Sequence, residues 1–249
     1  MTTNAAGDRV AAYRAAHASV LARIAEASAR VDRDPTEVTL LAVSKTIPAE
    51  ALRDAVAAGL DRLGENRVQE GLAKAPDVPG AHWHLIGPLQ GNKARRALEV
   101  FASIQSVDSV ALAERLDRLA GELRPGKRHP VLLQVNVDDD PAKAGFGPTA
   151  LEGAFGRLGE LPNLEIRGLM TIGRLVDSPE AARPTFRRLS ELSRAWRAAG
   201  AAIGPELSMG MTDDFEVAIE EGATIVRVGR ALFGERHDHE HHQGGPSPR

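Results

Sequence analysis

A lysine ends one of the most apolar runs of the chain, the segment LLAVSK that finishes at Lys45. An amine held against apolar walls is harder to protonate, so more of it is the neutral nucleophile that adds to an aldehyde. A solvated lysine at the end of a strand is the alternative, and the run alone does not choose between them. Pro48 follows and is typical of a helix start. Lys45 is therefore a candidate Schiff-base lysine.

Two segments near the other end of the chain have the composition of an anion site. Glu206–Thr212 (ELSMGMT) and Ile225–Gly234 (IVRVGRALFG) each read as a strand, a turn of Ser, Thr or Gly, and a helix start. Backbone N–H groups and hydroxyls at such a start bind phosphate. For the first segment an ordinary helix beginning near Asp213, with that residue as its cap, is the alternative.

An arginine lies inside the second of these strands. Arg227 alternates with Val226 and Val228, so its side chain should point to the face opposite theirs. It needs a partner there, because burying a lone charge is costly. A lysine that reacts with aldehydes, a phosphate site and an inward arginine together indicate a phosphorylated aldehyde as the ligand.

Other polar residues lie at predicted strand ends. Asn66 ends one run, and His84 lies in the next, where a core histidine with a satisfied hydrogen bond is the simpler interpretation. Lys143 either reaches the same region or is solvated, and its role stays open.

The elements that position these residues alternate along the chain. An Ala-rich helix is expected over Ala5–Arg30, and helices lie between most of the strand-like runs; Ser109 should cap one and Gly200 should end another that has Pro184 in its first turn. Strict alternation favours parallel βαβ units. Eight units predict an α/β fold, a (β/α)8 TIM barrel with an extra N-terminal helix, and an open doubly wound sheet is the alternative. The eight runs are Val38–Ser44, Leu60–Gly64, Trp83–Gly87, Phe101–Val107, Val131–Val137, Leu164–Thr171, Glu206–Met209 and Thr224–Val228.

Composition excludes several classes of protein. The 249 residues are 43% hydrophobic and 26% charged, with a net charge of −3 and no cysteine. Disulfide frameworks, cysteine nucleophiles and cysteine-ligated metals are therefore excluded, and a cytoplasmic location is expected. We expect neither nucleic-acid nor membrane binding, because no basic patch, apolar span or signal pattern stands out.

The chain divides into two parts of different character. We expect a single barrel domain over 1–235 and a disordered, His-rich tail over 236–249. Four of the eight histidines lie in this tail. Metal chelation there is conceivable, but nothing would hold the ligands in a defined geometry, so no metal site is predicted.

Six motifs resemble those of the pyridoxal phosphate homeostasis protein family, also called the proline synthase co-transcribed homologues. The resemblance implies a barrel like the alanine racemase N-terminal domain, with pyridoxal 5′-phosphate (PLP) held as a Schiff base on Lys45. The motifs are AVSKTIP (42–48), GENRVQE (64–70), WHLIGPLQGNK (83–93), GLMTI (168–172), SMGMTDDFEVAI (208–219) and VRVGRALFG (226–234).

The resemblance also implies roles for individual residues. Thr212 stands where the family often has Ser, and Arg230 where it often has a small polar residue, which adds charge there. Cofactor-binding residues are expected to be Lys45, Asn66 and Met209 near the ring, Arg227 facing the pyridine nitrogen, Ser208 and the backbone around Gly229 and Arg230 at the phosphate, and His84 on the rim.

Two functions compete for such a site. The resemblance implies a non-catalytic PLP carrier or buffer, monomeric, with PLP-dependent apo-enzymes as conceivable recipients. The alternative is a PLP-dependent amino-acid racemase, and a barrel enzyme for another phosphorylated metabolite is a third. Arg227 would disfavour protonation of the ring nitrogen and weaken the electron sink. Racemases of this fold take a second base from a tyrosine of an added domain, whereas the single tyrosine here, Tyr13, lies in the N-terminal helix. We therefore expect the carrier.

Overall fold

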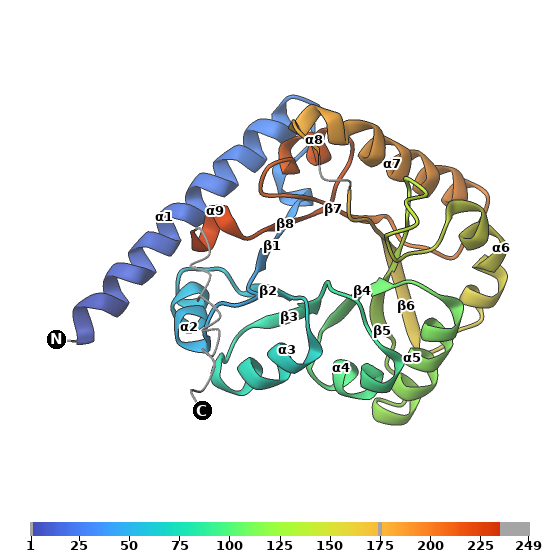
Figure 1. Ribbon diagram of the computed structural model, residues 1–249, viewed down its shortest axis with the longest axis horizontal. Helices are drawn as coiled ribbons and strands as arrows, with labels where there is room; N and C mark the ends of the chain where they lie inside the picture. The colour runs from blue at the N-terminus through green and yellow to red at the C-terminus, as the bar shows by residue number, and fades with distance from the viewer. Residues whose placement is uncertain (1, 174–175, 235–249) are drawn as a thin grey trace, which may run out of the picture.

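Eight parallel strands close into a barrel in the order of the chain (Figure 1). The computed structural model describes residues 2–173 and 176–234. The closure is made by β1 and β8, which pair in parallel from Thr39 beside Ile225 to Ala42 beside Val228. The strands are β1 (Thr39–Val43), β2 (Arg62–Glu65), β3 (His82–Leu85), β4 (Ser103–Val107), β5 (His129–Gln134), β6 (Leu164–Met170), β7 (Glu206–Met211) and β8 (Ile225–Val228).

Helices surround the barrel on its outside (Figure 1). Ser109 caps α5 by accepting a hydrogen bond from the Leu112 N–H, and Pro184 lies in the first turn of α7, as the sequence predicts. The helices are α1 (Thr2–Ala29), α2 (Ala49–Ala57), α3 (Val68–Lys74), α4 (Ala94–Val100), α5 (Val110–Leu123), α6 (Pro148–Gly159), α7 (Arg183–Ala198), α8 (Phe215–Glu220) and α9 (Arg230–Phe233), with short 3-10 turns over Pro35–Glu37, Ala75–Asp77, Gly91–Lys93 and Pro179–Ala182.

The apolar side chains form two clusters, one on each face of the sheet. The large cluster fills the shell between the strands and the surrounding helices. The small one plugs the inside of the barrel and consists of Leu41, Ile86, Leu132, Met170 and Ile225. Burial of such side chains stabilises the fold by about 25 cal/mol per Å². The plug also means that the barrel is a packed core below its mouth, not a channel.

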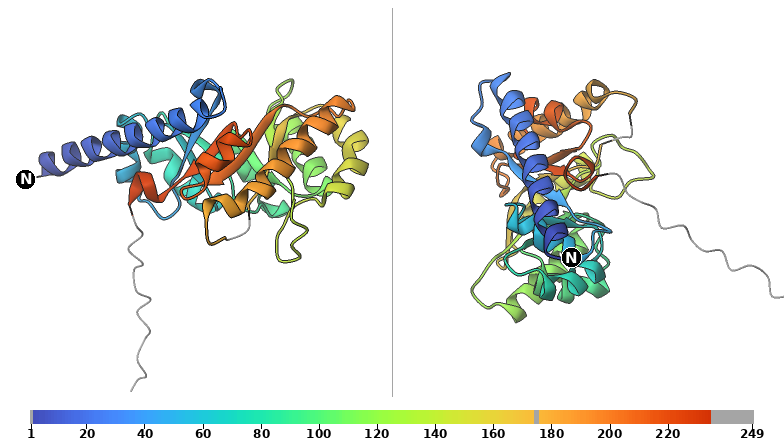
Figure 2. Two further views of the ribbon diagram at one scale, coloured as in Figure 1. Left: turned by 90° about the horizontal axis from the view of Figure 1, so that it is seen from above. Right: turned by 90° about the vertical axis from the view of Figure 1, so that its left-hand side faces the viewer.

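The extra helix α1 lies against the barrel near its closure. Val20, Ile24 and Ala27 are buried, and Arg23 and Arg30 form ion pairs with glutamates of α8. Figure 2 shows the earlier part of α1, drawn in dark blue, projecting beyond the other elements. The predicted N-terminal helix is thus confirmed. Its C-terminal half carries the buried residues and the ion pairs with α8, and its N-terminal half is held by ion pairs to α2 and by a ring contact with α9.

The closed sheet excludes the open doubly wound alternative. The helix expected near Asp213 begins two residues later, at Phe215, because the Asp214 carboxylate accepts a hydrogen bond from the Met211 N–H (2.6 Å) and holds the chain in a turn. The predicted tail over 236–249 lies outside the described residues. Among helices in the described ranges, none has the length and apolarity that crossing a membrane requires.

Candidate functional site

A cavity of about 260 Å³ opens at the carboxyl ends of β1, β7 and β8. This is the end of a (β/α)8 barrel at which active and binding sites are built. Pairing of β1 with β8 brings residues 43 to 47 beside residues 227 to 234. The cavity is lined by Val43, Lys45, Ile47, Met211, Thr212, Asp213, Arg227, Gly229, Arg230, Phe233 and Gly234.

Lys45 reaches the cavity because of the alternation of β1. Val43 and Lys45 both line it, whereas Ser44 between them is fully buried on the other side. The apolar side chains of Ile47 and Phe233 also line it. Lys45 is only partly exposed. This placement agrees with the interpretation of Lys45 as an amine against apolar walls, and it disagrees with the alternative of a fully solvated lysine.

Arg227 extends from β8 into the barrel and is 4% exposed. Its Nη1 donates to the Ser208 hydroxyl and its Nη2 to the Thr171 carbonyl oxygen, both at 2.8 Å. Burial lowers the pKa of Arg227 to about 10, and the Asp214 carboxylate opposes this shift. The guanidinium therefore stays protonated at neutral pH. The partners that a buried arginine requires are thus a hydroxyl of the neighbouring β7 and a carbonyl of the residue that follows β6.

The start of α9 turns backbone N–H groups toward the same region. Gly229 precedes α9, and its N–H donates to the Thr212 hydroxyl (3.2 Å). The β7 turn comes this close because Gly210 has a φ of 87°, and a Cβ there would lie 2.5 Å from the Cβ of Ala218. This helix start beside a hydroxyl lies where the sequence predicts an anion site, and that role stays a prediction.

An exposed ion pair lies at the edge of the cavity. Arg230 donates from Nη2 to the Asp213 carboxylate, and both residues line the cavity. Both side chains are at least half exposed, at 51% for Arg230 and 73% for Asp213. The extra charge that the sequence places at Arg230 is therefore free to reorient toward an anion, because exposed pairs hold their partners weakly.

Four predicted site residues do not line the cavity. Ser208 is fully buried and donates its hydroxyl to Gln105 Oε1 (2.7 Å) while accepting from Arg227, and Met209 is buried in the shell between strands and helices. Asn66, partly exposed, lies at the end of β2. His84 lies on β3, and burial beside Arg62 lowers its pKa to about 4. The roles predicted for these four residues stay predictions.

The structure also places residues at the site that the motifs did not single out for it. Asp214 shapes the β7 turn, and Gln105 of β4 continues the chain of hydrogen bonds from Arg227 through Ser208. Gln105 Nε2 is buried without a hydrogen-bond partner in the described part of the chain. No local pattern could reveal Gln105, because its contact with Ser208 spans 103 residues.

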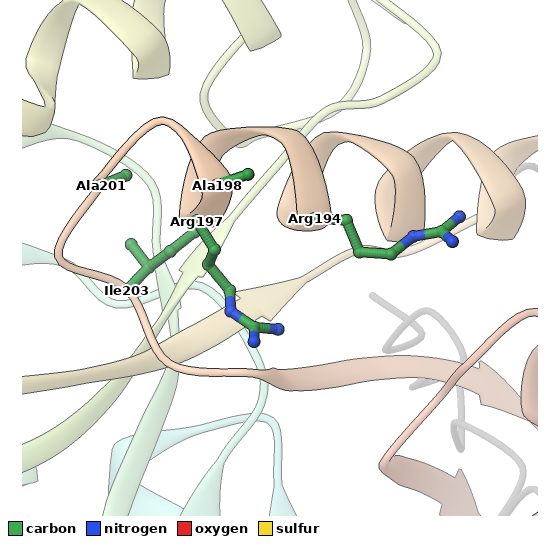
Figure 3. A pocket seen from close by; sticks show the side chains of 5 residues that line it. All are labelled: Arg194, Arg197, Ala198, Ala201 and Ile203. Carbon is green, nitrogen blue, oxygen red and sulfur yellow. The ribbon is translucent and has the colours of Figure 1, made fainter.

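A second hollow of about 430 Å³ lies away from the strand ends. Figure 3 shows it at the end of α7, where Arg194 and Arg197 extend along it. Ala198, Ala201 and Ile203 complete its lining. It contains no nucleophile and no strand-end residue, so the barrel mouth is the better candidate site.

The family model of the alanine racemase N-terminal domain matches residues 17–237. A pyridoxal phosphate homeostasis protein of Pseudomonas aeruginosa is 46% identical over 224 residues, covering 88% of this chain and 94% of that protein. The Escherichia coli protein of the same name is 40% identical over 232 residues, covering 88% and 94%.

Solved structures agree with the sequence relatives. PipY of Synechococcus elongatus with PLP bound has a TM-score of 0.74 and 45% identity, covering 85% of this chain and all of that one. An alanine racemase of Clostridium difficile, at 15% identity and a TM-score of 0.65, shares the fold. This chain therefore belongs to the pyridoxal phosphate homeostasis protein family, whose barrel is that of the alanine racemase N-terminal domain.

Proposed function

We propose that the chain binds PLP in the cavity at the barrel mouth and holds it as a Schiff base on Lys45. One observation carries the proposal: the amine of Lys45 meets a buried guanidinium and the N–H groups of a helix start, both from the much later segment 227–234, around one cavity. PipY, the relative with PLP bound, supports the choice of cofactor.

The residues fit the chemical groups of PLP. Lys45 supplies the amine for the aldehyde, and Arg227 supplies a donor for the pyridine nitrogen. The Arg230 N–H and the Thr212 hydroxyl supply donors for the phosphate, and the Gly229 N–H, which donates to that hydroxyl, orients it. A volume of about 260 Å³ lies just below the range of about 300–1,000 Å³ usual for small-molecule sites, which suits a compact single-ring ligand. Ser208 then orients Arg227 through the hydrogen bond between them.

We propose further that the protein carries or buffers the cofactor and does not turn over amino acids. Bound PLP acts as an electron sink, most strongly when a carboxylate keeps its ring nitrogen protonated. Arg227, a cation at neutral pH, disfavours that proton. The phenol of Tyr13 is not among the cavity-lining groups: its ring packs edge-on against Phe233, with 5.5 Å between centroids.

Transfer of PLP tests the carrier function. The loaded protein is mixed with a PLP-dependent apo-enzyme, and reactivation is compared with that by free PLP at equal concentration. Faster or more complete reactivation supports delivery, and slow release at the rate of dissociation supports buffering. Lys45→Ala should neither bind PLP stably nor show its visible absorbance band.

Incubation with L-alanine followed by chiral analysis tests the racemase alternative. We expect no D-alanine beyond that formed by free PLP. Rapid formation of the D-isomer that is lost in Lys45→Ala would contradict the carrier proposal. The predicted cytoplasmic location, monomeric state and apo-enzyme recipients remain proposals that accompany this one.

A further inference from the structure

Behind Lys45, on the face of β1 that looks away from the cavity, lies a cluster of charged side chains. Glu65 ends β2, and Glu70 and Lys74 belong to α3, which follows it. Glu65 is fully buried, and the Lys74 side chain is 12% exposed. We call these three residues the Lys74 cluster. No part of the proposed cofactor chemistry uses it.

The cluster binds the peptide group that precedes Lys45. Lys74 Nζ donates to the Ser44 carbonyl oxygen (3.0 Å) and to Glu65 Oε1 (2.7 Å). The Ser44 hydroxyl donates to the same carboxylate oxygen at 2.8 Å. Both the main chain and the side chain of Ser44 are therefore fixed by Glu65 and Lys74.

The cluster also binds the peptide group that follows Lys45. The Thr46 N–H donates to Glu70 Oε2 at 3.3 Å, and the same oxygen lies 3.5 Å from Lys74 Nζ. Thr46 has a φ of 68°, which is rare for a β-branched residue and costs about 1–3 kcal/mol. A turn of this kind persists only where its surroundings hold it. Glu70 supplies that hold, so both neighbours of Lys45 are clamped.

Stability does not explain why these charges are buried. An ion pair in the interior is often no more stable than apolar residues of the same volume, because both charges lose their hydration. Burial raises the pKa of Glu65 although Lys74 opposes the shift, and Glu65 Oε2 has no hydrogen-bond partner within the described residues. Burying these charges costs free energy, and the result is a defined backbone conformation on both sides of Lys45.

We propose that the Lys74 cluster is a positioning device that fixes the direction in which Lys45 enters the cavity. The proposal rests on the proposed function for the identity of the aldehyde that Lys45 meets. Lys74, Glu65 and Glu70 are not among the residues that line the cavity. They act through the main chain of Ser44 and Thr46, which sets the Cα–Cβ bond of Lys45.

Lys74→Met tests the proposal, with Lys74→Arg as the conservative variant that keeps the charge. We expect Lys74→Met to weaken PLP binding by about tenfold or more, because small displacements of a reacting group have large effects. The visible circular dichroism per bound PLP should also fall, since it reports a fixed orientation of the chromophore. Lys74→Arg should recover most of both.

Asp117→Ala is the matched control. Asp117 is also buried and also binds a main-chain group, accepting from the Asn163 N–H at 2.7 Å. Its helix, α5, lies across the barrel from β1 (Figure 1). The two variants should lose similar folding stability. We expect Asp117→Ala to change PLP affinity by less than about twofold, because it leaves the surroundings of Lys45 intact. Equal losses of affinity and of circular dichroism in the two variants would overturn the proposal.

Two further measurements keep the test decisive. If Lys74→Met does not fold, Glu70→Ala removes the contact with Thr46 and the longer contact with Lys74 Nζ, whereas Glu70→Gln keeps an acceptor for the Thr46 N–H. Equal behaviour of this pair would also overturn the proposal. Reductive methylation with isotope-labelled formaldehyde gives an NMR resonance for Lys45 without PLP. In Lys74→Met the chemical shift of that resonance should move to the value of solvated lysines. In Asp117→Ala it should not. If the wild type takes up no PLP, the proposed function fails, while this resonance still tests the clamp.

Discussion

Replacing Arg227 by methionine should separate binding from stability. Methionine fills similar space inside the barrel and carries no charge. The change removes the hydrogen bonds from Arg227 to the Ser208 hydroxyl and to the Thr171 carbonyl oxygen, each 2.8 Å long. It also removes the cost of holding a guanidinium that is 4% exposed. These two effects on the free energy of unfolding have opposite signs.

The structure sets the size of each effect. Two hydrogen bonds from a charged donor contribute about 1.5–3 kcal/mol each. Burial lowers the pKa of Arg227 from its ordinary value to about 10, which corresponds to a cost of about 3 kcal/mol for the charged form. The terms largely cancel, so Arg227→Met should lower the free energy of unfolding by no more than about 3 kcal/mol. PLP affinity, which loses one charged donor, should fall by about tenfold or more.

Urea denaturation measures the free energy of unfolding, and titration of the visible PLP band measures the PLP affinity. Arg118→Met on α5, which removes an exposed arginine whose ion pair within the described ranges is with Glu122, is the control and should change neither by much. A loss of stability well above about 4 kcal/mol would show that the hydrogen bonds outweigh desolvation. Unchanged PLP affinity would refute the place given to Arg227 in the site.

Three other changes test separate parts of the structure. Arg230→Ser should weaken PLP binding by less than about tenfold, more at low than at high salt, because the exposed arginine adds a screened charge near the phosphate; titrations at two salt concentrations measure this. Gly168→Ala should cost more than about 3 kcal/mol in urea denaturation, since φ is 153° and a Cβ would lie 1.9 Å from the Glu206 carbonyl oxygen. Burial lowers the pKa of His129 to about 4 from 6.5, so the folded state keeps it neutral while the unfolded chain takes up the proton. Stability should therefore fall by up to about 3 kcal/mol as the pH drops from 6.5 to about 4, and less so in His129→Leu.

The barrel and the side of each strand could largely be predicted from the sequence. Alternation of strand-like and helical runs is a local property, and it leaves few topologies. The period of two along β8 predicts an inward Arg227, and the apolar run that ends at Lys45 predicts a lysine at the carboxyl end of a strand. Both residues line one cavity. Parallel strands in chain order then bring their carboxyl ends to one mouth.

The β7 turn could not be predicted in the same way. Between Ser208 and Met211 the register against β8 shifts, so that three steps along β7 match two along β8. A bulge of this kind turns the following side chains to new directions. Met211 consequently lines the cavity, while Met209 packs in the shell and Ser208 binds Arg227.

The Lys74 cluster escaped prediction for another reason. The contact between Lys74 and Ser44 spans 30 residues, and it needs both the pairing of β1 with β2 and the position of α3. In the sequence Lys74 is an ordinary lysine at the end of a helix, where a cation is favoured anyway. Only the fold shows that its ammonium points at the residue before Lys45.

Mapping of the PLP attachment site tests the central claim most directly. The protein is incubated with PLP, reduced with borohydride, digested, and analysed by mass spectrometry for pyridoxyl-modified peptides. We predict a single modified residue at stoichiometric yield, Lys45, and no stable attachment in Lys45→Ala. Modification at Lys143 or Lys74 in its place, or stoichiometric attachment that survives Lys45→Ala, would contradict it.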